Sequence, residues 1–285
     1  MNPDWAAVAV RALGFACLYQ AAGAAFFIAL FGRGLRDIHE RICRLAVSAA
    51  VPGMALILMQ APLAAARMAG DYSGVTNGSL LHLAWHASSG IANAVQVAGL
   101  ALIVVGLHGR RGNSVAAAVL GAVLAACAPV LTGHTSVNPQ RALLAPLLAV
   151  HLLAVAFWFG ALAPLWLAIA HEAPADAARL LRRFSALAAW LVPCIALAGL
   201  AMAFLLIDHL AVLRRPYGLL LLVKLCLFAL LMVLAAVNRW HFTPALEAAV
   251  PARRSLQRSI VTEYLLITAA LVATAVLTTL YSPDD

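Results

Sequence analysis

The sequence has too little charge for a soluble protein. Only 11% of its 285 residues are Asp, Glu, Lys or Arg, whereas 65% are hydrophobic. A soluble domain averages roughly 45–50% apolar and about 25% charged residues. With so few charges the chain cannot cover its apolar surface in water, so much of that surface must face lipid. The composition therefore excludes an ordinary soluble domain and predicts an integral membrane protein in contact with the lipid bilayer.

Lysine is almost absent, because Lys224 is the only one and the other eighteen basic residues are arginines. The formal net charge of +8 alone is compatible with nucleic-acid binding. However, the arginines occur in short clusters between apolar segments, which is typical of cytoplasmic loops in membrane proteins. We therefore interpret the charge as a topology signal and expect no nucleic-acid partner.

Cysteine is scarce and scattered. The chain has five cysteines, an odd number, and no C-x-x-C motif. Four of them lie inside apolar runs, where cysteine usually behaves as a small hydrophobic residue. Neither a disulfide framework nor a zinc site is expected from this pattern.

Apolar segments occupy nearly all of the chain. A transmembrane helix needs about 20 apolar residues. The hydropathy pattern predicts an all-α, polytopic membrane bundle of eight transmembrane helices. We expect residues 1–285 to form a single transmembrane domain. The fourth segment is the shortest and ends near Pro129. The expected spans are residues 5–31, 45–67, 81–107, 114–131, 143–170, 184–207, 217–238 and 258–281.

The distribution of arginine between alternate loops predicts the orientation. Thirteen arginines fall in the loops after the odd-numbered spans, and four fall in the loops after the even-numbered ones. Loops rich in Lys and Arg remain on the cytoplasmic side. The odd-numbered loops are therefore predicted to be cytoplasmic, and both the N-terminus and the C-terminus periplasmic.

This orientation gathers histidines on the outer side. Two of them, His82 and His86, are four residues apart, so their rings share one face of a helix and can bind one metal ion. Neutral imidazole suits copper, zinc, iron and nickel. The five outer histidines among the nine in the chain are His82, His86, His134, His151 and His209.

His134 and His151 extend this candidate metal site into the membrane. His134 directly follows the fourth span, and His151 lies about 12 Å down the fifth at 1.5 Å per residue. Met59, toward the outer end of the second span, offers a thioether that selects Cu(I). Asn93 and Gln96 are candidates for a path deeper into the bundle. A hydrogen bond from each histidine to a backbone carbonyl is the alternative reading.

Two buried charges near the C-terminal end also need partners, because ionisable groups at membrane depth are costly. Lys224 and Glu263 lie on neighbouring spans, but at 1.5 Å per residue their backbones are more than about 10 Å apart in depth. We therefore expect Glu263 to contact Asn238 or Arg239 instead, as a structural brace.

The second half of the chain, roughly residues 130–282, resembles the copper resistance protein D family of bacterial inner membranes. The resemblance rests on an ordered series of short motifs, while His82 and His86 remain candidates on spacing alone. The motifs are Thr132-Gly-His134, His151-Leu-Leu-Ala-Val-Ala-Phe-Trp-Phe-Gly160, Arg183-Phe-Ser185, Tyr217-Gly-Leu-Leu-Leu-Leu-Val-Lys224, Asn238-Arg239 and Arg254-Ser-Leu-Gln-Arg258 before Glu263.

The resemblance implies a transporter, not an enzyme, that moves copper from the periplasm into the cytoplasm. It also implies a small periplasmic copper-binding partner of the copper resistance protein C type. His134 and His151 match the histidines of the family, and Lys224 and Glu263 match its buried charges. The spacing of His82 and His86 and the thioether of Met59 add three candidates to these two histidines. The expected copper site comprises His82, His86, His134, His151 and Met59, with copper as Cu(I) or Cu(II).

Two other functions remain open. A b-type haem protein needs two axial histidines on different helices at similar depth, and His86 and His151 form the candidate pair. A copper-binding protein that faces the periplasm without transporting the ion needs only the outer histidines. A metal-loading site has the same sequence pattern in a transporter and in such a binding protein.

Overall fold

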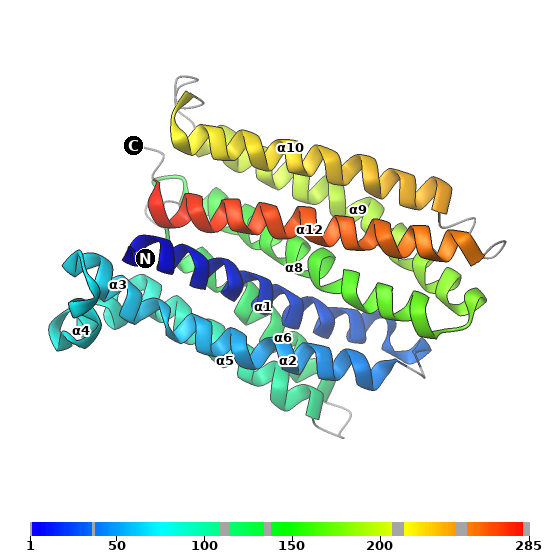
Figure 1. Cartoon of the computed structure of the whole chain (residues 1–285), viewed down its shortest axis with the longest axis horizontal. Helices are drawn as coiled ribbons and strands as arrows, with labels where there is room; N and C mark the ends of the chain where they lie inside the picture. Colours follow the sequence, from blue (N-terminus) through cyan, green and yellow to red (C-terminus); the bar gives the residue numbers. More distant parts are fainter. Residues whose placement is uncertain are drawn as a thin grey trace.

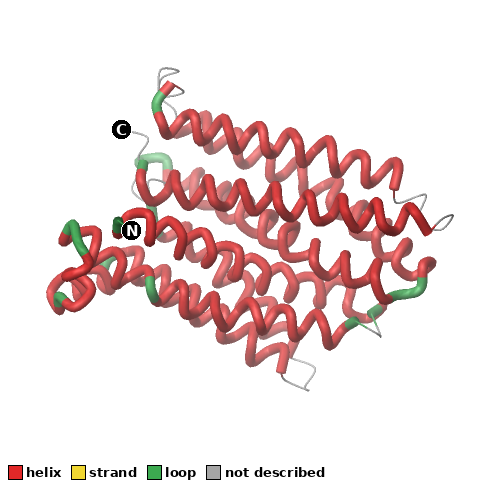
Figure 2. The backbone as a smooth tube through the Cα atoms, in the orientation of Figure 1, coloured by secondary structure: helices red, strands yellow, loops and turns green. Residues whose placement is uncertain are grey.

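The chain folds into a bundle of long helices, as its hydropathy pattern predicts. The computed structural model describes residues 2–35, 38–108, 114–133, 138–206, 214–242 and 250–281. Eight helical segments within them are long and apolar enough to cross a membrane, which confirms the predicted multi-pass bundle. The described residues form helices and loops without a strand (Figure 2). The segments are Pro3–Phe31, His39–Ala69, Ser88–His108, Ser114–Leu131, Arg141–His171, Pro174–Leu206, Pro216–Phe242 and Arg253–Leu280.

Several of these segments consist of more than one element, and three short elements, η1, η2 and α4, lie between them. The long helices run side by side along one direction (Figure 1). In chain order the elements are α1 (Pro3–Phe31), η1 (Gly32–Gly34), α2 (His39–Leu58), α3 (Gln60–Ala69), η2 (Tyr72–Thr76), α4 (Gly78–His86), α5 (Ser88–His108), α6 (Ser114–Cys127), η3 (Ala128–Leu131), α8 (Arg141–His171), α9 (Pro174–Leu206), α10 (Pro216–Val237), the π-helical turn η5 (Asn238–Phe242) and α12 (Val250–Leu280).

Helix α1 is the centre of the bundle and packs against α2, α6, α8 and α12. Its crossing with α8 depends on two glycines, Gly23 and Gly160. A Cβ atom at Gly23 would lie 2.1 Å from the carbonyl oxygen of Ala156 and 2.6 Å from the Cα atom of Gly160. Because no side chain fits there, the two backbones meet directly, as is common where small residues line membrane helices.

The second membrane segment is broken at Met59, between α2 and α3. Pro62 lies in the first turn of α3 and has no N–H to donate to the carbonyl of Leu58, so the helix cannot continue undisturbed. Helix α3 then ends at Gly70, whose φ of 83° is the left-handed conformation that favours glycine.

The third segment differs from its expected bounds of 81–107. The chain is extended at Ala87, which separates the nine-residue α4 from the membrane-spanning α5. Gly90 permits this break, because a Cβ atom there would lie 2.1 Å from the carbonyl oxygen of Trp85. His82 and His86 therefore lie on a separate short helix at the end of the bundle (Figure 1), not on the spanning helix.

Helix α4 packs against α3, α5 and η2. The turn before η2 is held by Asp71, which accepts hydrogen bonds from the backbone N–H and the hydroxyl of Ser73. These bonds hold the pKa of the Asp71 carboxyl below its usual value. Asn77 caps the start of α4 by accepting from the N–H groups of Ser79 and Leu80. Local capping thus fixes α4 beside α3.

The two ends of the chain meet at the same end of the bundle. Arg11 of α1 donates to the carbonyl of Thr278 at 2.8 Å, and Arg67 of α3 donates to that of Thr279 at 2.7 Å. Arg67 also pairs with Asp4 at 2.7 Å. Cations near the last carbonyls of a helix are favourable because those groups carry partial negative charge. We call this the outer end, following the predicted orientation.

Candidate copper site and buried polar groups

His151 is held inside the bundle by a contact between two helices. It lies ten residues after the start of α8, is half-buried, and its Nδ1 atom is 3.2 Å from the carbonyl oxygen of Ile195 on α9. A carbonyl can only accept, so Nδ1 carries the proton and the lone pair of the neutral ring is on Nε2. Ligating histidines commonly use their second nitrogen in this way.

Two further residues define the environment of the His151 ring. Gly199 of α9 lies beside it, and a Cβ atom there would be 3.5 Å from the ring atom Cε1. Lys224 of α10 is half-buried and interacts electrostatically with the ring. A protonated Lys224 would repel a metal ion on Nε2, since like charges oppose one another strongly where water is scarce. Copper at His151 therefore favours a neutral or displaced Lys224.

His82 and His86 are exposed and lie against each other on α4. Their ring centroids are 4.0 Å apart with an interplanar angle of 22°. The Nδ1 atom of His86 donates to the carbonyl of His82 at 2.8 Å, which leaves its Nε2 atom as the acceptor. The lone pairs of two nearly parallel rings do not converge on one point. A shared metal ion therefore requires a ring rotation, which the exposed surface allows.

The other proposed ligands lie on elements other than α4 or outside the described residues. Met59 lies at the junction of α2 and α3 with 51% of its surface exposed. His134 and His209 lie outside the described residues. Within those residues no group of three or more His, Cys, Asp or Glu could hold a metal ion. Within the described residues, His82 and His86 are the predicted ligands whose rings contact each other.

Glu263 has the neighbour expected from its depth. Its carboxyl accepts hydrogen bonds from the amide of Asn238 and from Trp158, and it is 4% exposed. A cavity of about 70 Å³ adjoins it, and Arg239 is the other charged residue that lines this cavity. Arg239 donates to the carbonyl of Ser185 on α9 at 2.9 Å. Glu263 thus connects α12, α8 and η5 in the inner half.

A buried polar link in the middle of the bundle was missed by sequence reasoning. Gln20 of α1 donates to the carbonyl of Gly160 at 3.1 Å, and its Oε1 atom accepts from the hydroxyl of Tyr264 at 3.1 Å. Tyr264 stacks on Phe159, with ring centroids 4.4 Å apart. The signal was present, since Gln20 is a polar residue inside an apolar span and such a group needs partners.

Asn93 and Gln96, the expected continuation of a polar path, are both buried on α5, with exposed fractions of 8% and 5%. Helix α5 packs against α2 and α6 and also contacts α1. These two amides therefore lie in the N-terminal part of the bundle, whereas His151 lies where α8 meets α9.

Comparison with known protein families identifies the chain. Residues 178–277 match the family described as copper resistance protein D, and residues 1–139 match the copper resistance protein D-like N-terminal domain. The chain belongs to the copper resistance protein D family. No curated protein and no solved structure matches it.

Family membership gives the chain a role in copper resistance and uptake, and its eight apolar helices make it a multi-pass membrane protein. The match to residues 1–139 extends the resemblance to the first half, which lacked recognisable motifs at the level of sequence. Residues 140–177 lie outside both matched ranges and include His151. The role of His151 is therefore argued from its geometry.

Proposed function

We propose that this protein carries copper across the bacterial inner membrane, from the periplasm to the cytoplasm, with His151 on the route. The observation that carries the proposal is the hydrogen bond from the His151 ring to Ile195, which leaves Nε2 free as a ligand in the outer half of α8. The arginine bias supports the orientation, with both termini periplasmic. Copper is the cargo here, so its binding at each step must be reversible.

We propose that His82 and His86 receive copper at the periplasmic face. Their exposed rings on α4 are accessible to another protein, which supports delivery by a periplasmic copper-binding partner of the copper resistance protein C type. Met59 is exposed at the α2–α3 junction at the same end of the bundle and can assist if the ion is Cu(I). His134 is the remaining proposed ligand, because it matches a histidine of the family motif.

We also propose that the two halves form a single transmembrane domain over residues 1–285. Support comes from the central α1, which packs against α8 and α12 of the second half. The Gln20 link to Gly160 and Tyr264 joins the halves through buried hydrogen bonds.

Copper flux into proteoliposomes tests the transport proposal. We expect wild-type protein to admit copper, and the double variant His134→Ala/His151→Ala to lose both flux and bound copper. His108→Ala is the matched control, because its ring is exposed and bonds to Val104 of its own helix. Copper that binds to wild-type protein without entering the vesicles would support a non-transporting, periplasm-facing copper-binding protein instead.

The same purified sample tests the haem alternative. A b-type haem held by His86 and His151 gives a strong Soret absorbance band, so its presence would overturn the copper proposal. His86 is exposed and stacked on His82, so its ring must leave this contact before it can ligate a haem together with His151. We therefore expect a copper-loaded sample without a Soret band.

A further inference from the structure

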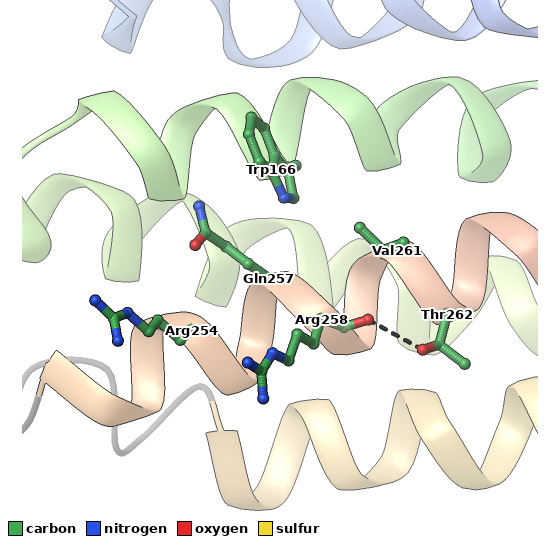
Figure 3. A pocket seen from close by; sticks show the side chains of 6 residues that line it. All are labelled: Trp166, Arg254, Gln257, Arg258, Val261 and Thr262. Carbon is green, nitrogen blue, oxygen red and sulfur yellow. Dashed lines mark hydrogen bonds between the residues drawn. The ribbon is translucent and has the colours of Figure 1, made fainter.

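A groove at the inner end of the bundle has no part in the proposed copper route. It has a volume of about 380 Å³ and lies between α8 and the first half of α12 (Figure 3). This end is opposite to the one where Arg11 meets Thr278. Its lining combines two cations, one large aromatic side chain and smaller groups. The lining residues are Trp166, Arg254, Gln257, Arg258, Val261 and Thr262.

The two arginines of the groove carry positive charge that can attract an anionic ligand. Arg254 and Arg258 are one helical turn apart, both are exposed, and within the described residues neither forms an ion pair. Figure 3 shows both side chains extending back toward the start of α12. Two guanidinium groups on one helix face match the geometry of a phosphate group, which accepts several hydrogen bonds from such forks.

The groove continues into an apolar surface at greater membrane depth. Val261 follows Arg258 by one turn and is 47% exposed, and Leu265 follows Val261 by another turn and is 62% exposed. Trp166 of α8 is 37% exposed on the opposite wall. Tryptophan is enriched where headgroups meet the hydrocarbon region. From the cytoplasm inward, the surface therefore changes from cationic to amphipathic to apolar, which is the order of groups along a phospholipid.

We propose that this groove binds an anionic phospholipid of the inner leaflet. The phosphate group lies between Arg254 and Arg258, and one acyl chain lies along Val261 and Leu265. Charge complementarity selects the ligand, since basic pockets between transmembrane helices on the cytoplasmic side attract anionic headgroups. The bound lipid contacts both α8 and α12, so it bridges the helices that carry His151 and Glu263.

Lipid retention measured by native mass spectrometry tests this proposal on the full-length protein. The protein is reconstituted with phosphatidylglycerol or phosphatidylcholine, and lipids that remain bound after release are counted. We expect phosphatidylglycerol to be retained and Arg254→Gln/Arg258→Gln to weaken its binding roughly 30-fold, given about fivefold for each arginine near the surface. Arg254→Lys/Arg258→Lys keeps the charge and should lose only part of this affinity.

The matched control is Arg33→Gln/Arg44→Gln, which removes two exposed charges at the same end but outside the groove. It should leave phosphatidylglycerol retention within about twofold of wild type, since surface charges without a built site contribute little. Equal losses in both double variants would overturn the proposal in favour of general surface attraction. Equal retention of phosphatidylcholine, or displacement of the lipid by free inorganic phosphate, would also overturn it. None of these readouts measures copper flux. The lipid proposal can therefore fail while the transport proposal holds, and the reverse.

Discussion

The three outer histidines that the structure describes, His82, His86 and His151, occupy two contrasting settings. His82 and His86 are exposed on the nine-residue α4, and each ring contacts the other ring of the same short helix. His151 lies half-buried on the 31-residue α8, and its ring is oriented by the carbonyl of Ile195 on another helix. The first setting permits rotation and exchange with a partner. The second fixes the direction of one lone pair inside the bundle.

This difference matches two separate roles in the proposed transport, namely capture of the ion on α4 and its passage beside His151 on α8. A site that receives an ion from another protein must be reachable and adaptable, whereas a site on a transport route must be positioned relative to several helices. His151 meets the second condition through α9, and it shares its surroundings with Lys224 of α10. The comparison can be tested by changing each setting independently.

The largest effect is expected for His151→Ala alone. Loss of this ligand should reduce the copper flux at saturating copper by at least about tenfold, the lower range for removal of groups around metal ligands. Flux into proteoliposomes measures this change. His171→Ala is a control, because His171 lies at the other end of the same helix. Unchanged flux in His151→Ala would remove His151 from the route.

A different change is expected for His82→Ala/His86→Ala. These variants should raise the copper concentration for half-maximal uptake by roughly tenfold, while the maximal flux remains near wild type. The reason is that the proposed role of the pair is to capture the ion, not to control its passage. A loss of maximal flux equal to that of His151→Ala would mean that the two settings form a single site, contrary to the comparison.

The smallest effect is expected for Lys224→Met. Removing a positive charge beside His151 should tighten equilibrium copper binding by up to about tenfold, because a neighbouring like charge disfavours the bound cation. Isothermal titration of the purified protein measures this affinity. Lys224→Arg retains the charge and should bind copper as wild type does. Weaker binding in Lys224→Met would show that the amine assists the site.

The spans could be predicted because a helix needs a minimum number of apolar residues to cross the bilayer, and such a run is visible in the hydropathy of the sequence. Even the short fourth span, 114–131, has the expected bounds. The breaks at Met59 and Ala87 were not foreseen, although Pro62 and Gly90 mark them. A proline or glycine in an apolar run is tolerated in membrane helices, so its effect depends on the neighbouring backbone.

The site was predictable only where depth along a helix decides the contact. Glu263 meets Asn238 because the two lie at the same level on consecutive helices. The bond from His151 to Ile195 depends instead on how α8 and α9 are rotated about their axes, which hydropathy does not specify. The same limit applies to Gln20 and Tyr264, whose contact joins residues that are 244 positions apart.

The contact of Arg11 and Arg67 with the last turn of α12 has a consequence for biogenesis. Arg11 and Arg67 precede Thr278 and Thr279 by 267 and 212 residues, so they are synthesised well before the carbonyls that they contact. During synthesis Arg11 therefore enters the bilayer before its partner on α12 exists, and a charged side chain at membrane depth is costly without partners. The hydrogen bonds of Arg11 and Arg67 can form only once α12 has inserted beside α1.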